Sequence, residues 1–403
     1  MPTIALALAG GGPLGAIYEI GALCALDEAL EGLDFTRLHH YVGVSAGGFI
    51  AAGLANGMSP REMCTSFIES RDGAGEAFDP SWLMVPAYGE FARRAAMFPG
   101  LAASAVWRAT LGRKSLTQAI ERLGPSLPTG IFSNDLIHHQ LARLFSRDGR
   151  TNDFRRLRTQ LTLVATNLDT GEAAPFGRPG WDHVPISKAV QASSALPGLF
   201  PPVEIDGCHF VDGALKKTMH ASVVLEDGID LLLCLNPLVP FNSTQSGTGG
   251  ESSGPAGIPR ITDGGLPAVL SQTFRSMIHS RMELGMKHYA RAYPDTDIVL
   301  IEPDQRDPEL YLANTFSYSR RRELAEHAYQ QTRGMLRSGR GGIASKLQRH
   351  GIQLRAHVLE DASRRLVAKD KVSTRIGRAV ASLQGAMDDL ARHIEPQLRR
   401  HPS

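Results

Sequence analysis

Two glycine-rich turns in the first 48 residues constrain the fold of this chain most strongly. An apolar run at residues 3–9 leads into the loop GGGPLG at 10–15, and a second run at 41–44 leads into SAGG at 45–48. Residues 16–30 lie between them and carry apolar side chains at helical spacing. The pattern predicts a strand, a glycine loop, a helix, a second strand and a sharp turn. This order is typical of an α/β fold.

The glycine loop can gather several backbone N–H groups at one point, because glycine tolerates positive φ and has no Cβ in the way. Pro13 suits the first position of the following helix, where a missing N–H removes no helical hydrogen bond. Such a loop stabilises negative charge, either on a phosphate or on the oxyanion of an acyl-transfer intermediate. The loop alone leaves both functions open.

The second turn, GVSAG at 43–47, matches the nucleophile elbow, in which flanking glycines relieve crowding at a tight turn that exposes the Ser45 hydroxyl. The glycine loop also fits the G-x-G-x-x-G pattern of dinucleotide-binding proteins, which requires an acidic residue at the end of the second strand. Only Asp34 is in range, and it lies before that strand. The two turns together therefore favour acyl transfer at Ser45 over nucleotide binding.

Two further motifs follow the loop and the elbow: QASSALP at 191–197 and Asp-Gly-Ala at 212–214. In order and spacing, the four motifs resemble those of the patatin-like phospholipase family over residues 3–240, with a weaker similarity as far as residue 337. The resemblance implies a three-layer α/β/α fold with a mainly parallel central sheet, to which this chain adds a helical C-terminal extension.

The resemblance also implies a serine–aspartate dyad that cleaves fatty-acyl esters through an acyl-enzyme. Ser45 is the expected nucleophile and Asp212 the expected base. The expected oxyanion hole consists of Gly10, Gly11, Gly12 and Ala46, and the supporting glycines of the motifs are Gly15, Gly43, Gly47 and Gly213. No cofactor or metal is expected, since no spacing matches a metal-binding or calcium-loop motif.

The sequence contains a second candidate for the catalytic base. Asp263-Gly264-Gly265 repeats the Asp-Gly motif of Asp212 inside a Ser- and Gly-rich segment. A base must be held rigidly within reach of the serine. Asp212 directly follows a predicted strand and is therefore preferred. Ser193 and Ser194 are interpreted as parts of a packed turn.

The chain departs from the family pattern at three positions. Leu14 replaces the usual Arg or Lys of the glycine loop, and Thr218 and His220 replace the usual Asn and Pro after the base. Because the oxyanion donors are backbone groups, these changes bear on substrate preference more than on the chemistry. Leu14 in particular removes a cation that would attract an anionic head group.

Periodicity and turn residues predict the remaining elements. Strands are expected at 160–166, 203–211 (a hairpin around Asp206-Gly207), 228–235 and 297–301, and helices at 49–58, 185–194, 268–293 and 319–336. The acyl-hydrolase domain is expected to cover residues 1–337. Within it, 71–153 forms either extra helices packed on the core or a helical lid, and 241–265 a flexible loop.

Residues 338–403 form a basic helical extension, with 13 Lys and Arg against 6 Asp and Glu. An apolar heptad seam at 376–394 suits packing on the chain's own domain, a homo-oligomer or an anionic membrane surface, and these alternatives stay open. Nucleic acid is not an expected partner.

Composition is that of a globular protein, with 42% hydrophobic and 21% charged residues. The four cysteines show no paired spacing. We expect the N-terminal apolar run, which glycines interrupt, to be a strand and not a signal peptide, and no apolar run is long enough to span a bilayer. We therefore expect reduced thiols in a cytoplasmic protein, with peripheral membrane contact as an open alternative.

The predicted function is hydrolysis of a phospholipid or another fatty-acyl ester, as by a phospholipase A, a lysophospholipase or an esterase. A Ser-Asp-His triad is less consistent with the sequence, because the elbow follows the second strand and no histidine belongs to a motif. The alternative to an active enzyme is a catalytically weak or inactive patatin-fold scaffold that binds a membrane or a partner through its basic C-terminal helices.

Overall fold

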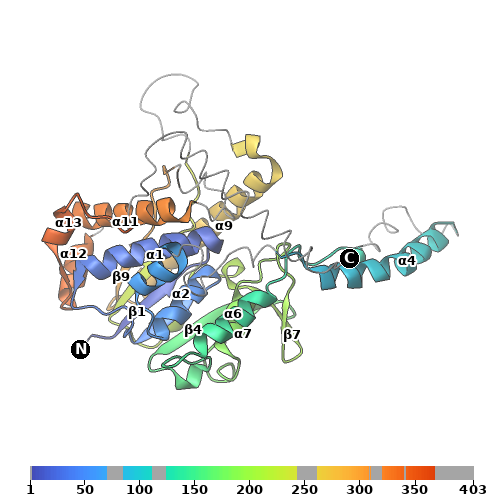
Figure 1. The fold of residues 1–403 in the computed structure, drawn as a ribbon, viewed down its shortest axis with the longest axis horizontal. Coiled ribbons are helices and arrows are strands. Elements are labelled where there is room, and N and C mark those ends of the chain that lie inside the picture. The colour runs from blue at the N-terminus through green and yellow to red at the C-terminus, as the bar shows by residue number, and fades with distance from the viewer. Residues whose placement is uncertain are drawn as a thin grey trace, which may run out of the picture.

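The computed structural model describes residues 2–69, 85–110, 124–242, 261–307, 309, 320–339 and 342–367. A central sheet lies between layers of helices (Figure 1). The strands of this sheet are β1 (Ile4–Leu8), β3 (His40–Gly43), β4 (Gln160–Asn167), β5 (Ala173–Phe176), β6 (Val203–Ile205), β7 (Cys208–Asp212), β8 (Leu231–Leu235) and β9 (Asp297–Ile301). The strand order is β6-β7-β4-β3-β1-β8-β9, and β5 pairs with β4.

The sheet is mainly parallel, as expected. Strands β4, β3, β1, β8 and β9 run parallel, whereas β5, β6 and β7 join antiparallel at the β4 edge. The register pairs Leu8 of β1 with Gly43 of β3 on one side and with Leu235 of β8 on the other. The segments that follow these three strands therefore emerge together at the carboxyl edge of the sheet.

The alternating side chains of β1 explain why it occupies the middle of a three-layer fold. Ile4, Leu6 and Leu8 belong to the larger apolar core on one face of the sheet. The small side chains of residues 5, 7 and 9, all alanine, belong to a second core on the other face. A strand buried on both faces has no polar side to turn towards solvent.

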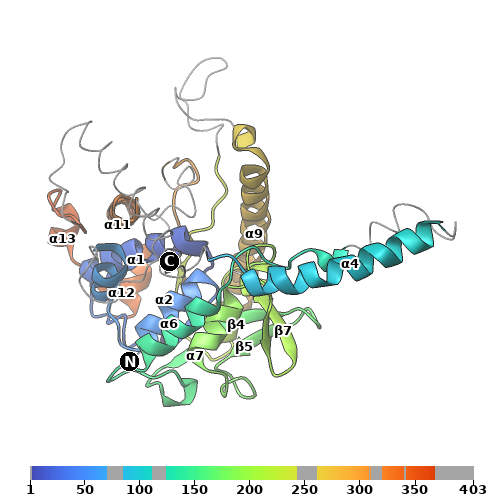
Figure 2. The ribbon, with the colours of Figure 1, turned by 45° about the vertical axis from the view of Figure 1, so that its right-hand side comes forward.

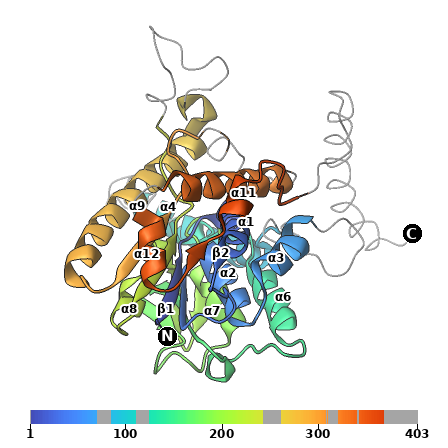
Figure 3. The same ribbon diagram turned by 90° about the vertical axis from the view of Figure 1, so that its left-hand side faces the viewer.

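The larger core is covered by α1 (Gly12–Ala29), α2 (Ala46–Ala55), α6 (Asp135–Phe145), α7 (Ile186–Ser193) and α11 (Arg321–Ser338). The second core is covered by α8 (Ser222–Leu225) and α9 (Gly265–Ala292). Figure 3 shows α8 and α9 on one side of β1, and α1 and α2 on the other. This arrangement confirms the predicted three-layer α/β/α class.

Helix boundaries differ from the predictions by a few residues. Helix α1 begins at Gly12, α2 at Ala46 and α9 at Gly265, each three or four residues before its predicted start. In each case the glycine-rich sequence predicts a loop, whereas the structure already has helical hydrogen bonds in this first turn. The predicted hairpin is confirmed, and its turn residues Asp206 and Gly207 have positive φ values of 51° and 76°.

The segment predicted as extra helices or a lid contains α4 (Tyr88–Thr110), a 3-10 helix η3 (Gly124–Ser126) and α6. Helix α6 buries Ile137, Leu141 and Phe145 in the larger core. Helix α4 instead extends away from the sheet (Figures 1 and 2). Its first two turns are joined to the segment before α6, where the Glu90 carboxylate accepts hydrogen bonds from Thr129 and the Arg94 guanidinium donates one to the Pro125 carbonyl. A lid role for α4 stays a prediction.

The last described residues pack on the main core. Helix α12 (Ile343–Arg349) contributes Ile343 and Leu347 to the larger core, and β10 (Gln353–Leu354) pairs antiparallel with β2 (Leu30–Glu31). Helix α13 (Ala356–Glu360) follows. The predicted heptad seam at 376–394 and most of the predicted loop at 241–265 lie outside the described residues, although Ile261–Gly264 form a 3-10 helix, η7. The division into domains stays a prediction.

The remaining short elements are α3 (Pro60–Met63), a π-helix η1 (Cys64–Glu69) and the 3-10 helices η4 (Phe154–Arg156) and η5 (Gly213–Leu215). All four cysteines are free, and the Cys24 thiol of α1 donates a 3.2 Å hydrogen bond to the Pro60 carbonyl. Within the described ranges, no helix is both long and apolar enough to cross a bilayer.

Gly21 controls how closely α1 approaches α11, because a Cβ at this position would lie 2.4 Å from the carbonyl oxygen of Ala325. We expect Gly21→Ala to lower the free energy of unfolding by about 1–3 kcal/mol through overpacking, although alanine is the better helix former. The matched control is Gly334→Ala in α11, where the nearest atom would be 4.0 Å away. We expect that change to stabilise by about 0.5–1 kcal/mol. Urea unfolding measures the stability change of each variant, and equal changes would contradict the close approach of α1 to α11 at Gly21.

Candidate functional site

The carboxyl edge of the sheet brings the two glycine-rich turns together. Because β1 and β3 are parallel neighbours, the loop after Leu8 and the turn after Gly43 emerge side by side. A Cβ placed on Gly10 would lie 3.2 Å from the Cβ of Ser45 and 3.3 Å from that of Ala214. The glycine loop, the elbow and the Asp-Gly-Ala motif therefore meet at one point, as the sequence predicted.

Ser45 forms the sharp turn between β3 and α2. Its backbone has φ 54° and ψ −123°, a left-handed conformation that is rare for a residue with a side chain. The flanking glycines are required by close approach: a Cβ on Gly43 would lie 2.6 Å from the Gly47 carbonyl oxygen, and one on Gly47 would lie 2.5 Å from that of Leu8. The serine is only 7% exposed.

Ser193, at the end of α7, fixes the elbow. Its hydroxyl accepts a hydrogen bond from the Ser45 backbone N–H at 2.8 Å and donates one to the Val164 carbonyl of β4 at 2.6 Å. One buried side chain thus joins the strained turn to the sheet. The interpretation of Ser193 as structural is consistent with this geometry, but no sequence pattern indicates that it contacts Ser45.

Asp212 is the last residue of β7 and is only 4% exposed. Its backbone N–H donates to the Ala195 carbonyl, and its carboxylate accepts a 2.8 Å hydrogen bond from the Ala214 N–H. The Ser45 hydroxyl lies close enough to this carboxylate to stabilise its charged form. The structure therefore brings together the predicted nucleophile and the predicted base.

Burial raises the pKa of Asp212 from 3.8 to about 6, because a charged carboxylate is costly to remove from water. The nearby Ser45 hydroxyl and the hydrogen bond from the Ala214 N–H stabilise the charged form and lower the pKa. The carboxylate is consequently charged at neutral pH and a stronger proton acceptor than an exposed aspartate.

The glycine loop lies at the N-terminus of α1, where backbone N–H groups have no helical partners. Within the described part of the chain, no group accepts a hydrogen bond from the N–H groups of Gly10, Gly11, Gly12 or Ala46. Pro237, which follows β8, packs under the loop, so that a Cβ on Gly11 would lie 2.8 Å from its Cγ and one on Gly15 3.1 Å. The arrangement suits the binding of a negative charge beside Ser45.

The two departures after Asp212 have structural roles. His220 has a positive φ of 48°, and its Nε2 donates a 3.1 Å hydrogen bond to the Gly213 carbonyl. Burial lowers the pKa of His220 to about 4, so the ring is neutral. Thr218 donates to the Ile278 carbonyl of α9. Both side chains therefore hold the segment that follows Asp212 in place. The sequence did not indicate these two contacts.

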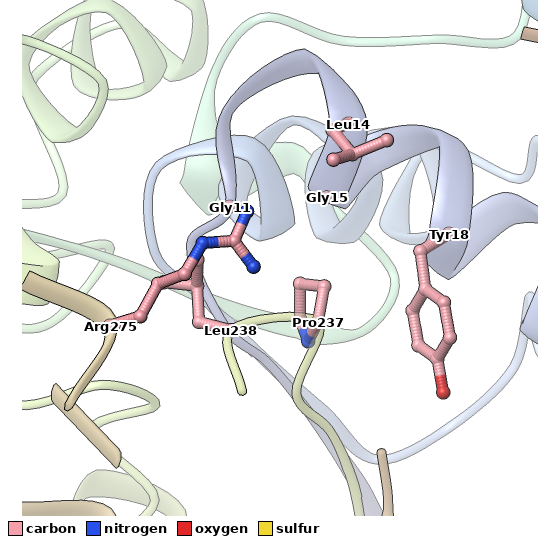
Figure 4. Close-up of a pocket in the computed structure, with 7 residues that line it drawn as sticks. All are labelled: Gly11, Leu14, Gly15, Tyr18, Pro237, Leu238 and Arg275. Atoms are coloured by element: carbon pink, nitrogen blue, oxygen red, sulfur yellow. The ribbon is translucent and has the colours of Figure 1, made fainter. Parts of the chain in front are cut away.

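The third departure, Leu14, lies beside a cation from a distant segment. Leu14 and Gly11 line a pocket together with Arg275 of α9 (Figure 4). The sequence placed Arg275 on a long helix and offered no sign that it approaches the glycine loop.

Asp263 lies in η7 at the start of α9, and its side chain is outside the described set. The preference for Asp212 over Asp263 therefore rests on the placement of Asp212 beside Ser45. Among the residues that the structure describes, no three His, Cys, Asp or Glu side chains gather as they would around a metal ion.

The fold and this site define the class of protein. The family model of the patatin-like phospholipases matches residues 6–225, which is more than half of the chain. The chain therefore belongs to the patatin-like phospholipase family, and membership indicates a lipid hydrolase in general terms.

Solved structures similar to this chain include bacterial effector proteins. VipD from Legionella pneumophila is 18% identical with a TM-score of 0.36, and the match covers 84% of this chain and 67% of VipD. The type III effector ExoU is 17% identical with a TM-score of 0.31, over 84% of this chain and 53% of ExoU. ExoU has also been solved in complex with SpcU from Pseudomonas aeruginosa, at 15% identity and a TM-score of 0.29, over 84% of this chain and 52% of ExoU. This chain thus spans about half the length of ExoU.

Ser193→Ala should lower the free energy of unfolding by about 1–3 kcal/mol, because the Ser45 N–H and the Val164 carbonyl are both buried and would both lose their partner. Ser194→Ala is the matched control, since no hydrogen bond of its side chain is found among the described residues. We expect that change to stay within about 0.5 kcal/mol. Urea unfolding of the two variants checks the prediction, and a neutral Ser193→Ala would mean that the elbow does not need this support.

Proposed function

We propose that this protein hydrolyses fatty-acyl esters, with Ser45 as nucleophile and Asp212 as general base. The observation that carries the proposal is the interaction between the Ser45 hydroxyl and the buried Asp212 carboxylate. A serine hydroxyl is a weak nucleophile until a base takes its proton, and Asp212 is the carboxylate beside it. The N–H groups of the adjacent glycine loop supply the second requirement, a place for the oxyanion.

The proposed reaction has two halves. The Oγ of Ser45 attacks the ester carbonyl as its proton passes to Asp212, and the carbonyl oxygen becomes an oxyanion held by N–H groups of Gly11, Gly12 and Ala46. When the oxyanion collapses, the C–O bond to the alcohol breaks and Asp212 returns the proton to the leaving oxygen. Water then attacks the acyl-serine, again losing its proton to Asp212, and the fatty acid leaves as Ser45 regains its hydrogen.

Apolar surface beside the site supports a fatty-acyl substrate. Leu196 is 40% exposed, although it directly follows Ala195, whose carbonyl accepts a hydrogen bond from the Asp212 N–H. Ile131 is 51% exposed and donates a backbone hydrogen bond to the Leu199 carbonyl. The Ile131 carbonyl accepts a hydrogen bond from the N–H of Ala87, which directly precedes α4, and Tyr88 at the start of this helix is also exposed. In this proposal, an acyl chain bound at Ser45 lies along this surface, and α4 acts as its lid or outer wall.

The competing hypothesis is a patatin-fold scaffold without activity. Its support is the excess of basic residues after position 338, which suits contact with a membrane or a partner. Hydrolysis of p-nitrophenyl esters of several chain lengths decides between the two, since a scaffold cleaves none of them. Cytoplasmic location, peripheral membrane contact and oligomerisation through the C-terminal helices remain separate proposals.

Removal of either dyad member should abolish activity. We expect Ser45→Ala and Asp212→Asn each to lower kcat/KM for p-nitrophenyl esters on the order of a thousandfold or more, because the two groups act as one unit. Asp263→Asn, the matched change in the repeated motif, should leave kcat/KM close to wild type. An active Asp212→Asn beside an inactive Asp263→Asn would reassign the base. Circular dichroism confirms that the variants remain folded.

The pH profile should report the titration of Asp212. Because the base works only when charged, kcat/KM should fall about tenfold per pH unit below pH 6. Stability should change in the opposite direction: the pKa of this carboxyl is raised in the folded state, so its contribution to stability is lost as pH rises through 6 and recovered on acidification. Comparing the melting temperatures of wild type and Asp212→Asn from pH 4 to 7 isolates that contribution. If the fall of kcat/KM on acidification coincided with unfolding of the protein, its assignment to Asp212 would be refuted.

A further inference from the structure

Glycines alone do not fix the shape of the loop after β1. Gly12 has a positive φ of 59°, and a run of glycines adopts left-handed and right-handed backbone with similar ease. The conformation of this loop must therefore come from the residues that pack against it. On one side these residues are Ser45 and Ala214, which lie against Gly10.

On the other side the loop rests on Pro237, the second residue after β8. The ring of Pro237 faces the loop at Gly11 and Gly15 (Figure 4). A Cβ on Gly11 would lie 2.8 Å from the Pro237 Cγ, and one on Gly15 would lie 3.1 Å from the same atom. The ring is thus in direct contact with the backbone of both glycines, and a shift of the ring would move that backbone or leave it unsupported.

The end of β8 also contacts the entry to the loop. The N–H of Ala9, which directly precedes Gly10, donates a 3.1 Å hydrogen bond to the Leu235 carbonyl. Leu235 therefore holds the loop where it leaves β1, and Pro237 holds it at the start of α1. The residue between them, Asn236, decides how these two contacts are placed relative to each other.

The Asn236 side chain is fully buried, at 0% exposure. Its Oδ1 accepts a 3.1 Å hydrogen bond from the Leu238 N–H, which closes an Asx turn around Pro237. Its backbone N–H donates a 2.9 Å hydrogen bond to the Ile301 carbonyl at the end of β9. One residue therefore fixes the backbone on both sides of Pro237.

The amide nitrogen of Asn236 has partners of its own. It donates to the Met282 Sδ of α9 at 3.0 Å and to the Glu302 carboxylate, directly after β9, at 3.4 Å. Without this side chain the Leu238 N–H would lose its acceptor and Glu302 a donor. The turn that carries Pro237 is thus tied to the neighbouring strand and to the second helical layer.

We propose that Asn236 is a positioning residue for the oxyanion hole. By closing the turn around Pro237, it holds the ring against Gly11 and Gly15 and so sets the direction of the loop N–H groups. The inference rests on the function proposed above, and it adds to the site a residue that belongs to none of the four sequence motifs. Asn236 contacts no reacting atom and acts through Pro237.

This role predicts which kinetic constant changes. Oxyanion donors must lie within about 0.5 Å of their productive position. A hydrogen bond from such a donor strengthens as the ester carbonyl becomes an oxyanion, so a displaced donor weakens binding of the transition state more than binding of the substrate. Loss of the Asn236 side chain should therefore lower kcat and leave KM almost unchanged.

Asn236→Ala should lower kcat for p-nitrophenyl butyrate about ten- to hundredfold, with KM changed less than about threefold. Asn56→Ala is the matched control. Asn56 is also buried, donates to the Ala52 carbonyl and accepts from the Thr151 N–H, but it lies at the end of α2 away from Ser45. Its kcat should stay within about twofold of wild type at a temperature where both variants are folded. An equal loss in the two variants, or an unchanged kcat in Asn236→Ala, overturns the proposal.

Two further variants separate positioning from a general loss of packing. Asn236→Ser offers a hydroxyl that accepts the Leu238 N–H in the same kind of turn, and its kcat should exceed that of Asn236→Ala by about threefold or more. Pro237→Ala removes the ring and keeps Asn236, and it should lower kcat at constant KM as Asn236→Ala does. A fully active Pro237→Ala would show that Asn236 does not act through this ring, and the proposal would be wrong.

Amide hydrogen exchange tests the contact without any substrate. The Gly15 N–H donates a 3.0 Å hydrogen bond to the Gly11 carbonyl, so its protection reports the shape of the loop. It should exchange about tenfold faster or more in Asn236→Ala and Pro237→Ala than in wild type, and at the wild-type rate in Asn56→Ala. If wild type cleaves no ester, the proposed function fails, while this comparison still decides whether Asn236 holds the loop. Equal exchange in all four proteins overturns the inference.

Discussion

The site depends on the close approach of the turn after β3 to the end of β1. A Cβ on Gly47 would lie 2.5 Å from the carbonyl oxygens of Leu8 and Ala9, and one on Gly43 would lie 2.6 Å from the Gly47 oxygen. This crowding leaves Ser45 as the residue whose side chain can leave the turn, and the left-handed backbone that results costs on the order of 1–3 kcal/mol. The hydrogen bond from the Ser45 N–H to Ser193 and the parallel pairing of β1 with β3 offset that strain.

Asp212 shows how the same crowding shapes the electrostatics. Gly213 allows β7 to end directly against β4, since a Cβ there would lie 2.2 Å from the Val164 carbonyl oxygen. Tight packing excludes water from the Asp212 carboxylate and raises its pKa, while the Ala214 N–H and the nearby Ser45 hydroxyl stabilise the charged form. Neutral His220 then holds the Gly213 carbonyl. The proposed nucleophile and the proposed base are therefore positioned by one set of contacts around β4.

The neighbourhood of the glycine loop depends on the order of strands rather than on the loop itself. Because β8 lies beside β1, Pro237 supports Gly11 and Gly15 from below, and α9 reaches the same edge from the second helical layer. Three stretches of chain far apart in sequence thus form the rim of the site.

The sequence by itself determined the α/β class, the parallel core strands, and the positions of Ser45 and Asp212 at strand ends, because glycine spacing and apolar runs reflect local backbone requirements. It also predicted the hairpin at Asp206, whose turn chemistry is local. Only the tertiary structure decided which distant groups complete the site. Ser193 binds the Ser45 N–H across 148 residues of sequence, and Thr218 binds the Ile278 carbonyl across 60. Such contacts arise from strand order and layer packing, which no local pattern of residues encodes.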